Sequence, residues 1–555
     1  MIFNSKKRKN SIGQFQGVLF LLFCIISIDS SAQQVFQHVN NTNIYEFIDE
    51  LANEKIVEIN TVVKPYSRKF IFQKLSEAKL KMERLNSRQK NDLDFYFKDY
   101  IKESEDFTSP PSSIEFKKSN KRLDAFFYRD SLFTLSINPV FGYAFYKNQN
   151  GSLHHKFSGG EMFGYYKNWG FYANLRDNFE SKRMNSPVYL TQRMGSEYKN
   201  NLSGGVDYSE MRGGITYSNK WVSVGLIKDH FVWGNNYNGS VIFSGRTPSF
   251  AQFFIKAKPV DWFEFNYVHG YLVSGIVDSV NSYTINKVNR LVYQQKLLSA
   301  NFFTVKPVKN LFISAGNSVV YSNMANNPVY LIPFFFYKSL DHTYSPNGNN
   351  GGQNAQMFLD ISSRNIKHVH LYSSVFIDEI SFSRMMDKTK QSNLVSFKLG
   401  VRSSNLFFKN LFFTAEYTRT NPIVYKHYIT TTTFSSNDFN LGHYLKDNSR
   451  EFFLSLMYKP ISRMVLRFSN TNAQVGNNYP DIRKPNLVWG LPFLKDIKWS
   501  NTNYELALKY EIKSDLFLNA SYNYSNVKGD DVKLYTPEYL IGKQQTYSFG
   551  LNFGF

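Results

Sequence analysis

The last ten residues of the chain constrain its fold more than any other stretch. From Thr546 to Phe555 the sequence reads TYSFGLNFGF, so every second residue is aromatic or aliphatic and the residues between are small or polar. Successive side chains of a β-strand point to opposite faces, so this pattern predicts a strand with one apolar, aromatic face. A soluble sheet rarely ends in such a strand. The upstream sequence must therefore supply its partner strands, and the apolar face of the strand needs an apolar medium around it.

The N-terminus has the pattern of a secretory signal peptide. Four basic residues at positions 6–9 precede an apolar run from Val18 to Ile28, and small residues at positions 30–32 follow it. We expect cleavage after Ala32, and the apolar run is too short to cross a membrane as a helix. Cys24, the only cysteine, lies within this run and follows Phe23, a residue that disfavours lipidation. The mature chain therefore has no thiol for disulfides or metal binding.

The composition of the chain favours a membrane-spanning β-barrel over membrane-spanning helices. Aromatic residues make up 17% of the 555 residues, yet the mean hydropathy is only −0.37. No other run approaches the length of a spanning helix. A closed barrel with a polar lumen needs only every second residue to be apolar, which reconciles these values.

Connections of two kinds separate the alternating segments after residue 123. Short ones rich in Pro, Asn, Asp and Gly occur at 168–170, 218–220, 258–261, 306–310, 408–410, 459–462 and 512–515; long polar ones occur at 180–204, 234–246, 278–293, 323–352, 421–449, 473–501 and 527–544. Short turns at one end and long loops at the other are typical of outer-membrane barrels. Strands such as 394–402 and 452–458 alternate apolar residues, expected to face lipid, with polar ones, expected to face the lumen. This reading gives about 18 antiparallel strands, or 16 or 20 if one hairpin is misread.

The segment at about 40–105 follows a helical pattern instead. Asn43, Ser67 and Asn86 are predicted N-caps of three helices, with Glu46 and Gln89 at capping-box spacing from the first and the last. The unit is too small for a substantial core of its own, so we expect it to plug the periplasmic mouth of the barrel. The predicted organisation is a signal peptide at 1–32, a helical plug at 33–120 and an outer-membrane β-barrel at 121–555.

The charge indicates the kind of partner. The net charge is +21, of which residues 1–32 contribute +3, so the mature chain carries +18. A basic exported barrel favours acidic polysaccharide or lipopolysaccharide phosphates, and we expect no nucleic-acid partner.

Several stretches resemble known proteins. The closing strand, ending in Phe553 and Phe555, resembles the terminal strand that bacterial outer-membrane barrels present to their insertion machinery. The stretches 41–54, 62–68, 230–239, 244–249, 331–333 and 349–354 resemble the Wzi-like capsule-assembly proteins, within them the branch that includes the gliding-motility protein RemB. The resemblance extends over essentially the whole mature chain. It implies an 18-stranded barrel plugged by helices, whose outer face binds capsular or other surface polysaccharide as a lectin.

No enzyme motif is present. The patterns Gly-x-Ser-x-Gly and His-Glu-x-x-His do not occur, and no Gly-rich phosphate loop opens a helix. His368 and His370 have a spacing that would put both on one strand face and could hold a metal, but with no Cys and no nearby carboxylate triad a lumen or turn position is favoured. We expect no catalytic activity, no cofactor and no metal.

Two loops are the predicted polysaccharide-binding sites. Trp233 next to Asn235, Asn236 and Tyr237 combines an aromatic platform with amides, as sugar recognition requires; the alternative is an aromatic-girdle Trp above an ordinary loop. Arg483, Lys484 and Trp489 offer the same ingredients with two cations for acidic sugars.

The sequence thus predicts a monomeric gram-negative outer-membrane protein, with periplasmic helices and extracellular loops, that attaches capsule or exopolysaccharide. Two other functions stay open: docking of a gliding-motility or secretion protein by the loops, and a porin.

Overall fold

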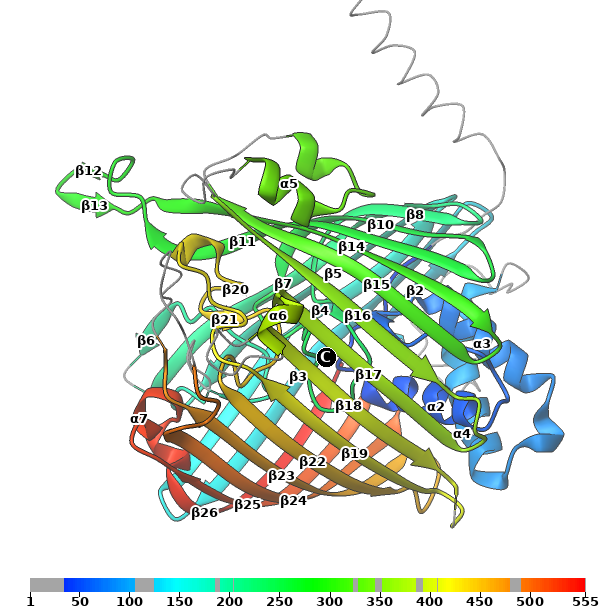
Figure 1. The fold of residues 1–555 in the computed structure, drawn as a ribbon. Coiled ribbons are helices and arrows are strands. Elements are labelled where there is room, and N and C mark those ends of the chain that lie inside the picture. The colour runs from blue at the N-terminus through cyan, green and yellow to red at the C-terminus, as the bar shows by residue number, and fades with distance from the viewer. Residues whose placement is uncertain are drawn as a thin grey trace, which may run out of the picture.

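The chain folds into a closed antiparallel barrel of 18 strands with helices at one end (Figure 1). The structure is a computed structural model and describes residues 34–104, 124–184, 190–202, 204–322, 328–344, 352–385, 393–406, 408–479 and 491–554. The fold class and strand number predicted from the sequence are confirmed. The predicted signal peptide lies outside the described residues.

Eighteen long strands make the barrel wall in chain order. They are β3 (Phe133–Asn148), β4 (Gly151–Tyr166), β5 (Trp169–Glu180), β7 (Gly205–Ser218), β8 (Val222–Asp229), β10 (Phe250–Val260), β11 (Phe263–Val277), β14 (Tyr293–Val308), β15 (Leu311–Ser322), β16 (Gln353–Ser363), β17 (Val369–Glu379), β18 (Leu394–Ser404), β19 (Leu411–Thr420), β22 (Ser449–Tyr458), β23 (Met464–Gly476), β24 (Ile497–Lys513), β25 (Leu516–Lys528) and β26 (Gly542–Phe553). The terminal strand β26 pairs with β3 and closes the barrel. The alternating C-terminal stretch is therefore the seam of the wall.

Shorter elements decorate this wall. Helices α2 (Thr42–Asn53), α3 (Arg68–Lys79) and α4 (Ser87–Tyr100) precede it, and the loops carry α5 (Tyr337–Tyr344), α6 (Phe382–Met385) and α7 (Val532–Tyr535); short strands are β1 (Val63–Lys64), β2 (Phe126–Arg129), β6 (Asn200–Leu202), β9 (Val232–Trp233), β12 (Tyr283–Ile285), β13 (Val288–Arg290), β20 (Ser435–Ser436) and β21 (Phe439–Asn440); one-turn 3₁₀ helices are Met82–Arg84, Ile101–Glu103, Pro328–Leu331, Thr430–Thr432 and Glu538–Leu540. Among the residues that the structure describes, no helix is both long and apolar enough to cross a membrane.

The two ends of the barrel differ as the turn pattern predicts. Hairpins such as β10–β11 and β24–β25 turn within a few residues at one end, which we call the short-turn end, while connections such as 421–448 gather at the other, the long-loop end. In Figure 1, α2, α3 and α4 lie at the short-turn end, and the β12–β13 hairpin projects beyond the opposite end.

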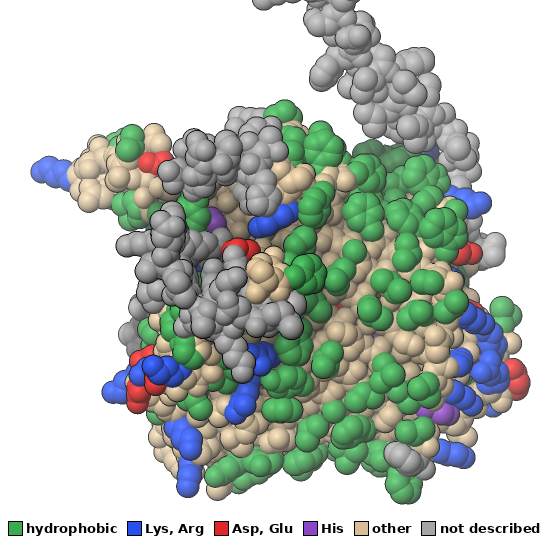
Figure 2. All heavy atoms as spheres, in the orientation of Figure 1, with side chains coloured by type: hydrophobic (Ala, Val, Ile, Leu, Met, Phe, Trp, Pro, Cys, Tyr) green, Lys and Arg blue, Asp and Glu red, His purple; other side chains and the backbone are tan. Residues whose placement is uncertain are grey.

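The two faces of the wall also follow the predicted alternation. Leu399, Leu454 and Leu456 are exposed on the outside, whereas Lys398 and Glu451 on the same strands are buried inside. Figure 2 shows apolar side chains spread over the outer wall between two ends where charged side chains gather. An outer face of this kind suits lipid, since a charged residue at mid-membrane costs about 2–4 kcal/mol.

Polar contacts fix the helical unit at the short-turn end. Asn53 Nδ2 on α2 donates to Ser404 Oγ at 2.8 Å, and Ser462 Oγ donates to Asp92 on α4 at 2.7 Å. Both partners lie where a barrel hairpin turns. The helices thus bind barrel turns that are far away in sequence.

Two of the three predicted caps are confirmed. Ser67 accepts from the backbone of Phe70, and Asn86 forms a capping box with Gln89. The cap at Asn43 is wrong, because the N-cap position is Asn41, two residues earlier, and α2 begins at Thr42. The Asn43 side chain instead donates to Glu511 of β24 at 3.2 Å, so a barrel contact has taken the place of the cap.

Candidate functional site

A cavity of about 330 Å³ opens among the loops at the long-loop end. The loop 421–448 supplies most of its wall. Residues 475–479, α7, Leu190, and Ser274 and Ile276 at the end of β11 supply the rest. These segments are far apart in sequence, and the barrel's strand order brings them together.

The cavity combines aromatic rings, amides and charges. Its lining includes Tyr425, Tyr479 and Tyr535, the amides Asn440, Asn448, Asn477 and Asn478, the cations Lys426 and Lys446, and the carboxylates Asp438 and Asp447. Aromatic faces match the C–H faces of sugar rings, and amides and charged groups match hydroxyls and acidic substituents. The donor set therefore suits a short stretch of polar, ring-containing polymer.

Hydrogen bonds organise this lining. Lys426 Nζ donates to Asn478 Oδ1 and, at 3.3 Å, to the carbonyl of Tyr479, which joins the two loops. The Tyr425 hydroxyl donates to the Val241 carbonyl at 2.7 Å and so ties the cavity floor to the barrel interior. Tyr479 donates its hydroxyl to the Pro492 carbonyl at 2.9 Å. The floor is thus held by the interior, and the rim by contacts between loops.

The charged groups are shifted by their surroundings. Burial raises the pKa of Asp447, although Lys426 and two backbone N–H groups oppose this. Burial also lowers the pKa of Lys446, against the pull of Asp438 and Asp447. Both shifts favour the neutral forms of these groups. A bound partner of opposite charge would favour the charged forms instead.

The structure corrects the first predicted site. Trp233 is not an exposed platform: its side chain is only 1% exposed and stacks on Phe302 of β14, with ring centroids 5.4 Å apart. Neither the sugar-platform reading nor the girdle reading describes it. The loop 230–249 folds into the barrel, because Phe231, Trp233 and Phe243 find apolar partners on the inner wall.

The neighbours of Trp233 are engaged inside as well. Asn235 Nδ2 donates to Asp360 of β16 at 2.5 Å, and the Tyr237 hydroxyl donates to Asp49 of α2 at 2.7 Å. Asn236 Nδ2 donates to the Gly234 carbonyl at 2.8 Å within the loop. These residues bind the loop to the wall and the plug, and in this arrangement no external polymer reaches Asn235, which is buried.

The second predicted site, Arg483, Lys484 and Trp489, lies outside the described residues. Its flanks are described: Tyr479 and Leu491 bracket the segment, and Tyr479 lines the long-loop cavity. Phe555 also lies outside the described residues, whereas Phe553 ends β26 and stacks on Phe141 of β3 at 5.7 Å. The assembly role of both phenylalanines stays a prediction.

Sequence reasoning missed Tyr425, Lys426, Lys446 and Asp447. They lie in the connection 421–449, which the sequence marks only as a long polar loop. The pair Tyr425-Lys426 was a usable signal, since it has the same aromatic and cationic content as the loops that we singled out.

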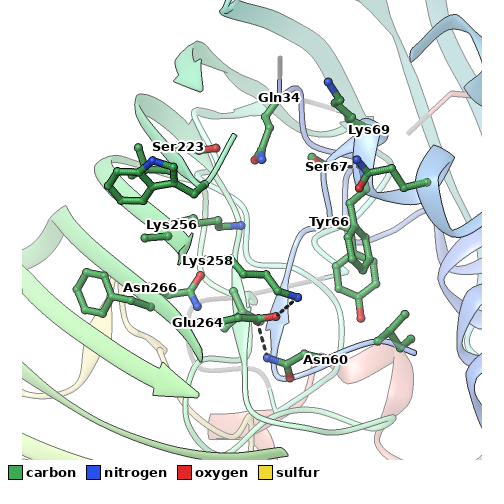
Figure 3. Close-up of a pocket in the computed structure, with 18 of the residues that line it drawn as sticks. Gln34, Asn60, Tyr66, Ser67, Lys69, Ser223, Lys256, Lys258, Glu264 and Asn266 are labelled. Carbon is green, nitrogen blue, oxygen red and sulfur yellow. Dashed lines mark hydrogen bonds and ion pairs between the residues drawn. The ribbon is translucent and has the colours of Figure 1, made fainter. Parts of the chain in front are cut away.

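A larger cavity, of about 630 Å³, lies at the short-turn end between the helical unit and the wall (Figure 3). Lys258 pairs with Glu264 at 3.2 Å, and Asn60 donates to the same carboxylate at 2.8 Å. Lys256 donates to the Pro65 carbonyl at 3.1 Å. These polar groups join the helical unit to β10 and β11, so we read this space as the seam between the helical unit and the wall.

Side-chain hydrogen bonds hold several of the described histidines. His370, inside the barrel, contacts Tyr237 and Ser362, and His368 lies at a turn, as predicted. His38, Asp229 and His230 come within 4.8 Å of one another. His38 Nε2 and His230 Nδ1 share a hydrogen bond of 3.2 Å, and Arg212 lies 3.8 Å from Asp229. A guanidinium at that distance opposes a cation, so we assign no metal to this group.

Comparison with known proteins supports the fold. No family model and no curated protein matches the sequence. Among solved structures, the chain is similar to Wzi of Escherichia coli, described as an outer-membrane protein involved in group 1 capsule assembly and a carbohydrate-binding β-barrel, with a TM-score of 0.55, 12% identity, and coverage of 94% of this chain and 100% of that one. OccD3 of Pseudomonas aeruginosa matches at a TM-score of 0.42 and 11% identity, over 76% of this chain and 90% of that one. At such identities the similarity to Wzi establishes the barrel architecture alone.

Proposed function

We propose that this chain is an outer-membrane protein that binds surface polysaccharide, without catalysis, through the long-loop cavity. The observation that carries the proposal is the lining of that cavity, in which tyrosines, amides and two lysines face one space. Its position at the barrel end opposite the helices suits a ligand outside the cell. The fold shared with a carbohydrate-binding barrel supports the same reading.

The proposed orientation follows from the same asymmetry. Outer-membrane barrels have short turns in the periplasm and long loops outside, so the helical unit would be periplasmic and the cavity extracellular. Export by the predicted signal peptide and insertion through the terminal strand complete this assignment. The ligand would be capsular or exopolysaccharide, with acidic polymers favoured by the +18 charge of the predicted mature chain.

The filled interior distinguishes this proposal from a porin. The loop 230–249 places Trp233 and Phe243 against Phe302, Phe358 and Phe376 of the inner wall, in one buried cluster. A diffusion pore needs a wet lumen, whereas this apolar cluster occupies the interior. We therefore propose that the intact protein does not conduct.

Binding of purified protein to polymer from the producing strain tests the proposal. Individual glycan contacts are weak and add up by avidity, so the assay uses intact polymer and not monosaccharide. Tyr479→Ala and Lys426→Gln should each weaken binding, since they remove one ring and one cation of the cavity. The matched controls are Tyr283→Ala and Lys287→Gln on the β12–β13 hairpin, where Tyr283 is 58% exposed and outside the cavity.

Two outcomes would overturn the proposal. Equal loss of binding in the cavity and hairpin variants would show general charge attraction instead of a site. The second outcome combines two observations: the wild-type protein binds no polymer, and a strain that lacks the protein loses surface spreading but keeps its capsule. That result would favour docking of a motility or secretion protein. The relation to the gliding-motility branch also stays a prediction until that phenotype is measured.

A further inference from the structure

The connection between β15 and β16 lies against the outside of the barrel wall. Its described residues, 328–344, include α5, which packs on β15 and β16 and lies on the outer side of the wall in Figure 1. Tyr330 and Tyr337 are buried in one cluster with Phe265, Tyr267 and Tyr321 of the wall. The ring of Phe334 stacks on Phe265 at a centroid distance of 4.6 Å. This segment therefore packs on the outer wall and does not cover the barrel end.

The burial pattern of β15 shows which face is covered. Outward positions alternate along the strand, and Ile313 and Ala315 are exposed while Asn317, Val319 and Tyr321 on the same face are buried. Side chains on one face of one strand share an environment unless something covers part of it. The cover is residues 328–340, because Tyr337 N donates to Asn317 Oδ1 at 2.8 Å and Tyr330 packs on Tyr321 at 4.5 Å.

The covered part of the wall is polar. Ser299 and Asn301 of β14 and Asn317 of β15 face outward, on the side where most exposed wall residues are apolar. Ser299 Oγ donates to the Tyr330 carbonyl at 2.8 Å, and Asn301 Nδ2 donates to the carbonyls of Pro333 and Phe335 at 3.0 and 2.8 Å. Polar groups exposed to lipid without partners would cost several kcal/mol each. The backbone of residues 330–335 supplies these partners.

The polar patch lies within the apolar belt and not at its edge. Asn301 pairs with Asn317 between two rows of exposed apolar residues on the same outer face. Ile313 and Leu359 lie on its short-turn side, and Tyr271 and Val273 lie on its long-loop side. The segment that covers the patch is therefore at membrane depth.

The outer surface of this segment is strongly apolar. Residues 329–336 read VYLIPFFF without a charge. Leu331, Ile332, Phe334, Phe335 and Phe336 are exposed, with Phe334 65% exposed. Water-facing loops rarely present such a patch, whereas lipid acyl chains favour it.

We propose that residues 328–340 form a membrane flap, whose apolar side chains contact lipid acyl chains and whose backbone shields the polar patch of the wall. The partner is the hydrocarbon of the bilayer, and the surface continues the apolar belt on either side. The inference rests on the proposed outer-membrane location, and it assigns to the membrane a segment that the sequence places among the external loops.

Single-cysteine labelling tests the flap, because Cys24 of the predicted signal peptide is the only natural cysteine. Phe334→Cys and Phe336→Cys are placed in vesicles and labelled with a lipid-soluble fluorophore, and nitroxide-bearing phospholipids serve as quenchers. Leu359→Cys reports the apolar belt, and Val280→Cys, at a position 89% exposed on the long-loop side, reports water. A heat-dependent shift on gels shows that each variant forms the barrel.

We expect lipid quenching at Phe334→Cys and Phe336→Cys to match that at Leu359→Cys, together with loss of labelling by a charged, membrane-impermeant maleimide. Quenching at Leu359→Cys alone, with both flap positions labelled as readily as Val280→Cys, would overturn the flap and leave the membrane location intact. Free labelling of Leu359→Cys as well would refute the membrane location and the flap with it.

Discussion

Replacing Glu50 by Gln should loosen the helical plug from the barrel. Glu50 lies on α2, has no exposed surface, and pairs with Arg88 of α4 and, at 3.1 Å, with Lys459 at a barrel turn. Gln89 and Asn405 also donate to its carboxylate, at 2.8 and 3.2 Å. One charge thus connects two helices and two barrel hairpins.

The size of the expected destabilisation follows from the buried cations that lose the Glu50 carboxylate. Removing one partner of a buried ion pair typically costs about 3–5 kcal/mol, because the remaining charge stays buried. Arg88 keeps Asp92, and Gln can still accept hydrogen bonds, so we expect the lower end, about 3 kcal/mol. Local opening of α2 should then be roughly 150-fold more frequent.

Hydrogen exchange of a peptide that covers α2 measures this opening directly. The matched control is Glu77→Gln on α3, whose carboxylate pairs with Lys74 and Lys81 at a position where its side chain is 34% exposed. Surface pairs contribute at most about 1 kcal/mol, so the control should change α2 exchange by less than about fivefold. Exchange in Glu50→Gln within that same range would refute the claim that the buried network holds the plug.

Further predictions follow from the same contacts. Burial alone would raise the pKa of Asp49, but Arg364, Arg402 and His370 hold that pKa well below its usual range. Burial would also raise the pKa of Glu50, but Lys459 and Arg88 lower it to about 2. Their stabilising contribution is present above about pH 4 and is lost as the pH falls through the folded pKa values. The protection of the α2 amides, which is the intrinsic exchange rate at the same pH divided by their observed rate, should therefore fall only under acid conditions. Lower protection at pH 8 than at pH 5 would contradict this. Trp233→Ala should destabilise the interior by about 3–5 kcal/mol. In planar bilayers this variant should produce conductance bursts, whereas the intact protein should stay closed. Large steady conductance steps from the intact protein would contradict the filled interior. Deleting residues 42–103 should likewise produce openings, and a silent deletion variant would count against the plug. Phe555→Ser should lower the amount of protein in the outer membrane, and unchanged levels would remove the assembly role from the terminal strand.

The barrel was predictable because its rules are local. Period-two alternation and turn residues identify strands one hairpin at a time, so the count of 18 needed no long-range information. Capping signals at Ser67 and Asn86 were local as well, and they held. Asn43 failed because its partner, Glu511, is 468 residues away and is not implied by any nearby pattern.

The destinations of two long loops were not predictable by these rules. A polar loop with aromatic residues reads as an external binding site, yet 230–249 turns into the barrel and 328–344 lies along its outer wall. Whether such a loop stays outside depends on which side chains of the barrel wall can contact it. Composition of the loop alone does not contain that information.

The walls do carry the missing signal, as breaks in their two-face pattern. Inward positions should be polar, but Phe254, Phe302, Phe358 and Phe376 face the interior, and each gives its strand two or three apolar residues in a row. Outward positions should be apolar, but Ser299, Asn301 and Asn317 face the membrane side. An apolar residue on the wet face needs an apolar loop, and a polar residue on the lipid face needs backbone partners, since either would otherwise be unstable. These breaks mark where the two loops come to rest, and reading strands and loops together would have placed both.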